Sequence, residues 1–127
     1  MKKIALALVL ASFVASADET TINITMGSMA QGLSKIQAGF LYNNKKDVLD
    51  GIKTIEEANS VFKKVDVSSF MPNNKKIQVT KNINHNLEKS LESMKKDVKA
   101  NKFAQASEDY SKVLNNCMAC HTIIRGW

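Results

Sequence analysis

Apolar residues recur at steps of three and four along most of this chain, the spacing that keeps side chains on one face of an α-helix. Four such stripes run from Ile22 to Phe40, Val48 to Phe62, Ile83 to Val98 and Phe103 to Ile124. One Pro and five Gly in 127 residues leave few breaks within them. Strand-type alternation is nearly absent. The sequence therefore predicts an all-α fold, in which four amphipathic helices form an antiparallel four-helix bundle.

Capping residues and Pro72 mark the expected ends of these helices. We expect helices over about residues 20–42, 45–65, 75–99 and 102–125. Asn44 and Asn101 stand just before two of them and are predicted as N-caps, because a short polar side chain there accepts a hydrogen bond from a free backbone N–H group. Segment 66–74 contains Pro72 and is predicted to be a loop. Two apolar residues of this loop are expected to fold back over the bundle, Phe70 and Met71.

The first residues have the pattern of a secretory signal. Met1-Lys2-Lys3 is a basic start, a mostly apolar run follows from Ile4 to Val14, and Ala15-Ser16-Ala17 is a small-residue cleavage pattern. We expect residues 1–17 to be removed as a signal peptide and residues 18–127 to form one bundle domain. The apolar run is shorter than the about 20 residues of a membrane-spanning helix, so no integral membrane segment is expected after cleavage. The alternative is a signal that stays attached as an anchor.

Near the carboxyl end stands Cys117-Met118-Ala119-Cys120-His121, the spacing at which c-type haem is attached. Each thiol can form a thioether with one haem vinyl group, and two Cys three residues apart are neighbours on a helix. The imidazole of His121 is a usual proximal ligand of haem iron. One alternative is a surface Cys pair with an incidental His. The others are a redox dithiol, whose usual βαβ setting is missing, and a zinc site, for which the two cysteines are too few. We therefore expect one haem c per chain, attached outside the cytoplasm.

The stripes predict where this haem lies. Cys117 and Cys120 both fall on the apolar stripe of the last predicted helix, so the haem is expected in the core of the bundle. Gly32 and Gly39 border the first stripe, where Gly costs about 1 kcal/mol in a helix. Close approach of another helix, or of the flat haem, would explain them. His85 lies off the stripe of its helix and is predicted to be a surface residue.

The order of these features resembles the class II cytochromes c, which comprise cytochrome c′ and its low-spin, Met-ligated relatives. The resemblance covers the whole predicted mature chain, and its specific part is Cys117, Cys120, His121 and Arg125. It implies that the Cys pair holds the haem and that His121 is the proximal iron ligand. It also implies that Arg125 lies beside the proximal pocket.

The distal side of the haem is implied by the same resemblance. Met26, with apolar residues 3, 7 and 10 positions after it, matches the residue that faces the iron in this family, and Met29 is the alternative after a shift of one turn. Both could instead be core residues. A Met ligand implies low-spin iron and electron transfer, whereas a non-ligand implies five-coordinate iron that binds gases. Ile22 and Ile124 depart from the family pattern, which often has Arg and Tyr there, and the first departure removes an expected contact to a haem propionate.

The expected function is that of a periplasmic mono-haem c-type cytochrome, a one-electron carrier for redox partner proteins rather than an enzyme. The alternatives are a five-coordinate cytochrome c′-type protein that binds nitric oxide, and a haem-free binding module with a Cys117–Cys120 disulfide. The full chain has a net charge of +6, and loss of Lys2 and Lys3 with the signal would leave +4 on the mature domain. This modest charge permits docking to acidic partners, although solubility is the usual role of such lysines and the favoured explanation. The lysines are interleaved with acidic residues, which is not the pattern of nucleic-acid binding. The family includes monomers and homodimers, so a homodimer stays open.

Overall fold

The structure, a computed structural model, describes residues 2–66 and 77–125 of the chain, and side-chain environments for 19–66 and 77–124. These residues form four helices, α1 (Lys2–Leu41), α2 (Lys45–Phe62), α3 (Ile77–Lys99) and α4 (Phe103–Arg125). No β-strand occurs among the described residues. The all-α prediction is therefore confirmed for this part of the chain.

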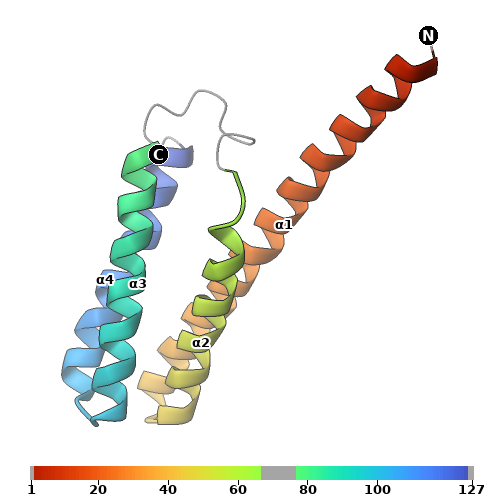
Figure 1. Ribbon diagram of the computed structural model, residues 1–127. Helices are drawn as coiled ribbons and strands as arrows, with labels where there is room; N and C mark the ends of the chain where they lie inside the picture. Colours follow the sequence, from red (N-terminus) through yellow and green to blue (C-terminus); the bar gives the residue numbers. More distant parts are fainter. Residues whose placement is uncertain (1, 67–76, 126–127) are drawn as a thin grey trace.

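The helices form two helical hairpins, α1–α2 and α3–α4, which lie side by side (Figure 1). A short turn at residues 42–44 joins the first pair, and another at residues 100–102 joins the second. Between the hairpins, α2 packs on α3 and α1 packs on α4. Both short turns therefore lie at one end of the molecule, and the end of α2 and the beginning of α3 lie at the other. The arrangement is compatible with the predicted antiparallel bundle.

The main difference from the predicted boundaries is the start of α1, which begins at Lys2 rather than near Thr20. Residues 4–17 contain neither Pro nor Gly, so nothing in them interrupts the helix. Figure 1 shows this first part of α1 extending beyond the other three helices. The removal of residues 1–17 stays a prediction. Among the helices that the structure describes, none is long and apolar enough to cross a membrane.

The remaining boundaries agree with the prediction to within a few residues. The helix predicted to reach residue 65 ends at Phe62 as α2, and the last helix begins at Phe103. The predicted fold-back of Phe70 and Met71 lies outside the described residues, as do residues 75–76.

Asn44 caps α2 as predicted. Its side-chain oxygen accepts a hydrogen bond from the backbone N–H of Asp47, at 3.2 Å. The preceding residue, Asn43, has a φ of 54°, in the left-handed region that Asn tolerates better than most residues. One residue therefore ends α1 and the next begins α2, which explains how so short a turn reverses the chain.

Asn101 corrects a prediction, because it ends α3 instead of capping α4. Its φ is 60°. The N–H of Lys102 donates to the carbonyl of Asp97 at 2.8 Å, and that of Asn101 donates to the carbonyl of Val98 at 3.1 Å. This pair of bonds is the Schellman motif of helix ends. The side-chain oxygen of Asn101 accepts from Lys45 Nζ at 3.0 Å and so serves the neighbouring hairpin.

The core is made by all four predicted stripes. Burial of apolar side chains contributes about 25 cal/mol for each Å² removed from water, so these residues supply most of the favourable free energy of folding. The fully buried large side chains all come from the stripes, namely Ile36, Val48, Ile52, Ile55, Leu91, Met94, Val98 and Val113. Phe40 and Tyr110 add a tilted aromatic contact between α1 and α4, with ring centroids 6.1 Å apart.

Glycines allow α1 and α2 to approach each other closely. A Cβ atom on Gly32 would lie 2.6 Å from Ile55 Cγ1, and one on Gly51 would lie 2.7 Å from the carbonyl oxygen of Gly32. A Cβ on Gly39 would meet Val48 at 2.6 Å. Of the two explanations offered by the sequence, the described side chains therefore support the approach of another helix.

Candidate functional site

A cavity of about 100 Å³ lies where all four helices meet, in the half of the bundle away from the short turns. Five of its lining residues are those that the sequence singles out for a haem, Met26, Met29, Cys117, Cys120 and His121. The other lining residues are mostly apolar and come from every helix, namely Ala30, Leu33, Asn59, Phe62, Ile83, Asn84, Leu87 and Asn116. Residues nearly 100 positions apart in the sequence are therefore brought to one place.

The motif on α4 divides cleanly between the cavity and the surface. Cys117, Cys120 and His121 line the cavity, whereas Met118 is 43% exposed and Ala119 is exposed. Helical geometry explains the division, since residues three and four apart share a face and the two between them do not. The two thiols and the imidazole can therefore act on one ligand.

Both cysteines are free thiols and partly buried. Burial raises the pKa of Cys117, and the neighbouring Cys120 raises it further. Burial also raises the pKa of Cys120. Reactive dithiols of redox enzymes have lowered pKa values, because the thiolate is the nucleophile. Neither thiol therefore has the lowered pKa that is typical of a reactive dithiol.

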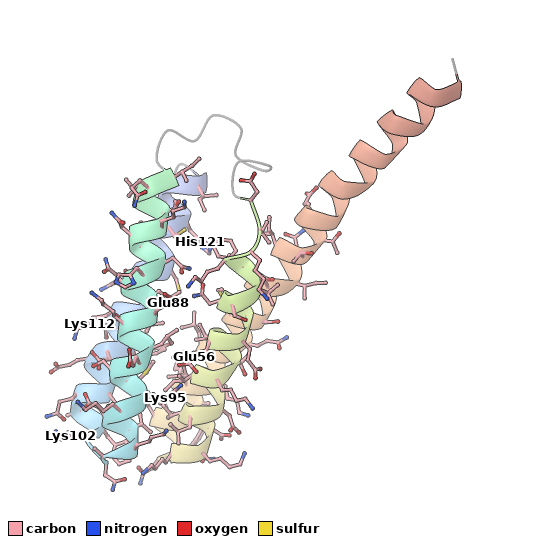
Figure 2. All side chains as sticks on the ribbon, in the orientation of Figure 1. Glu56, Glu88, Lys95, Lys102, Lys112 and His121 are labelled. Carbon is pink, nitrogen blue, oxygen red and sulfur yellow. The ribbon has the colours of Figure 1, made fainter. Side chains whose placement is uncertain are left out.

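The two histidines differ in position. His121 is partly buried in the cavity wall, and Figure 2 shows it in the same upper half of the bundle as Glu88. His85 is exposed, as predicted. Arg125 is the last residue of α4, one helical turn after His121, and its side chain is outside those described.

Met26 and Met29 both reach the cavity from α1. Met29 is only 7% exposed and belongs to the buried core, whereas Met26 is partly buried and packs against that core. Either thioether can therefore face a group held in the cavity. The structure leaves the choice between them open.

A pair of asparagines forms a polar part of the cavity wall that the sequence reasoning missed. Asn59 is 2% exposed, and its amide nitrogen donates to Asn84 Oδ1 at 3.3 Å. In return, Asn84 Nδ2 donates to Asn59 Oδ1 at 2.6 Å. The sequence feature that could have indicated this pair is the position of Asn59, four residues after Ile55 on the apolar side of its helix.

The donor set fits a covalently attached haem. Paired thiols on one helix face, an imidazole one residue further on and thioethers opposite are the groups that such a haem uses. The cavity is smaller than the about 300–1,000 Å³ of most small-molecule sites, so a macrocycle could enter it only if the two hairpins moved apart.

Cys117, Cys120 and His121 share a cavity, but no three His, Cys, Asp or Glu side chains in the described part of the chain are placed so that they could hold a bare metal ion. Haem iron does not require such a cluster, because the porphyrin supplies its equatorial ligands. Comparisons with known protein families, with curated proteins and with solved structures find no match for this chain.

Proposed function

We propose that this chain is a periplasmic mono-haem c-type cytochrome of the class II kind, which carries single electrons. The observation that carries the proposal is the gathering of Met26, Met29, Cys117, Cys120 and His121 around one cavity between four helices. The cysteine spacing alone would permit other ligands. The thioethers that line the same cavity from α1 favour haem iron.

Each residue then has a definite task. Cys117 and Cys120 would hold the haem covalently, His121 would donate an imidazole nitrogen to the iron, and Met26 would donate its sulfur from the opposite face, with Met29 as the alternative. When bound, haem supplies an iron that gains and loses one electron. The apolar walls exclude water, and a Met/His ligand set favours the reduced iron.

The remaining expectations belong to the same proposal. Arg125 would lie beside the proximal side of the haem. Secretion would place the protein in the periplasm, where its net positive charge favours acidic redox partner proteins. The electron stays on the cofactor, so the proposal includes no catalytic residue.

The test is to express the full chain in a bacterium that matures c-type cytochromes and to extract the product with acid acetone. Covalent haem remains with the protein and keeps its Soret band. The double variant Cys117→Ala/Cys120→Ala is expected to lose the band completely. A wild-type product without haem, or a double variant that keeps covalent haem, would refute the proposal.

A five-coordinate cytochrome c′-type protein is the second candidate, favoured by the burial of Met29 in the core. If both Met residues serve packing, the distal side is bounded by apolar groups such as Leu33 and Leu87 and can admit nitric oxide. The spin state of the same product decides between the candidates, because a Met ligand makes the iron low-spin.

A further inference from the structure

A second cavity, of about 570 Å³, opens beside the first between the end of α2 and the beginning of α3. Phe62 and Asn84 line both cavities, so the two adjoin. Their chemistry differs, because no Lys, Arg, Asp or Glu lines the first cavity, whereas three Lys and two acidic side chains line the second among apolar ones. The second contains three lysines and a histidine against two acids, namely Lys63, Lys64, Lys81, His85, Asp66 and Glu88.

Haem likewise has an apolar half and a charged half. Its vinyl groups lie on one half of the macrocycle and its two propionates on the other. Thioethers at Cys117 and Cys120 would fix the vinyl half against α4. Because α4 packs beside α1 and α3, α2 is the helix diagonally opposite. The propionates would thereby be directed towards α2 and its contact with α3.

We propose that this basic cavity binds the two haem propionates and that Lys63 is their principal cationic partner. The inference rests on the proposed function and goes beyond it, because it fixes how the macrocycle is turned within the bundle. The α1 residues of the first cavity offer no competing cation, since they are Met26, Met29, Ala30 and Leu33. The cation that Ile22 fails to supply would thus come from α2.

Lys63 could exchange its present partner, Glu88, for a haem propionate. Lys63 Nζ lies 2.7 Å from Glu88 Oε1, in a pair whose side chains are 51% and 38% exposed. Exposed ion pairs contribute little to stability, so a second carboxylate can compete for the lysine. Asn59 Nδ2 also donates to Glu88 Oε1, at 3.3 Å, from the wall of the first cavity. The carboxylate of Glu88 therefore accepts from Lys63 and Asn59, two donors that could equally bind a haem propionate.

Lys64 and Lys81 strengthen the positive field. Neither forms an ion pair with another described residue, although both line the cavity. Lys81 and His85 lie one helical turn apart on α3, on the face that also carries Glu88. Three lysines against two acids leave a net charge of +1, which favours the approach of a carboxylate.

The experiment compares Lys63→Met with Lys95→Met in the haem-loaded protein. Lys95 also bridges α3 to α2, through Glu56 at 2.6 Å, but lines neither cavity. Figure 2 shows Glu56 and Lys95 nearer the short turns than Glu88. The haem is labelled with carbon isotope at its propionate carboxylates. Their NMR signals and the midpoint potential are then measured.

Lys63→Met is expected to shift at least one carboxylate signal and to lower the potential, because a cation beside the haem favours the added electron. Glu88→Gln should raise the potential, and Lys95→Met should leave the carboxylate signals in place. Unchanged carboxylate signals in Lys63→Met, or equal shifts in both lysine variants, would overturn the inference. A chain without covalent haem would instead refute the proposed function, so the two failures are distinguishable.

Discussion

In the proposed cytochrome, the thioether sulfurs of Met26 and Met29, one helical turn apart, would compete for a single position on the haem iron. Met26→Leu keeps a similar volume, so its packing cost should stay under about 1.5 kcal/mol. The iron of the haem-loaded variant should nevertheless become five-coordinate and high-spin, fall in potential and bind carbon monoxide. Absorption and electron paramagnetic resonance spectra report the change, and Met29→Leu is the matched control.

Three outcomes are informative for this pair. If Met29→Leu changes the spin state and Met26→Leu does not, the ligand is one turn further along α1 and electron transfer stands. If the wild type is already high-spin, the gas-binding candidate replaces the electron carrier. Low-spin iron in both variants would show that neither thioether is required.

The thiols give a second prediction at this scale, for the chain before haem is attached. Burial raises the pKa of Cys117 and Cys120 above the about 8.5 of a free thiol, so the folded state keeps its protons longer than the unfolded state. The resulting stability is present below the unfolded pKa and is lost as the pH rises through the folded pKa.

Alkylation by iodoacetamide measures this effect directly. The folded chain should react slowly near neutral pH, and its rate should still be rising where that of the urea-unfolded chain has levelled off. Cys120→Ala should move the Cys117 profile to lower pH, since Cys120 contributes to its shift. Faster reaction of the folded chain at neutral pH would point to a redox dithiol.

Among the helices, the close contact between α1 and α2 depends on glycines, whose missing Cβ atoms leave room for the other helix. Gly51→Ala would place a Cβ 2.7 Å from Gly32 O and 2.9 Å from Ile36 N, and backbone atoms cannot turn aside. Overpacking costs about 1–3 kcal/mol, whereas Ala gains about 1 kcal/mol of helix propensity. We expect a net loss of stability in urea unfolding followed by circular dichroism.

Gly27→Ala is the control for this contact, because nothing lies within 4 Å of its Cβ position. It should gain up to about 1 kcal/mol from helix propensity alone. Equal effects of the two substitutions would mean that the helices do not approach as closely as described.

Helix positions could be predicted because apolar spacing determines them, but two ends could not. Asn101 suits both a helix start and a left-handed helix end, and only the backbone bonds to Asp97 and Val98 distinguish the two. The start of α1 was missed because the residues before Thr20 were assigned to a signal peptide, although their helix propensity continues unbroken.

For the whole molecule, the sequence predicted the lining of the candidate site better than its surroundings. Met26 and Cys117 could be placed together because stripes that face one core must meet, and His121 could be added because it directly follows Cys120 in the motif. The Asn59–Asn84 pair and the basic cavity could not, since they depend on which helices are neighbours and on how far α2 runs. Periodicity assigns a residue to a face, but it does not name the opposing residue.

One contact between the hairpins has a mechanical consequence. Lys45 Nζ donates to the carbonyl of Lys99 at 3.1 Å and to Asn101 Oδ1 at 3.0 Å, and so fastens one short turn to the other. The candidate site lies at the opposite end of the helices. If a haem enters there, the hairpins would separate least at Lys45 and most beside the site, where the Asn59–Asn84 and Lys63–Glu88 hydrogen bonds that join α2 to α3 would have to break.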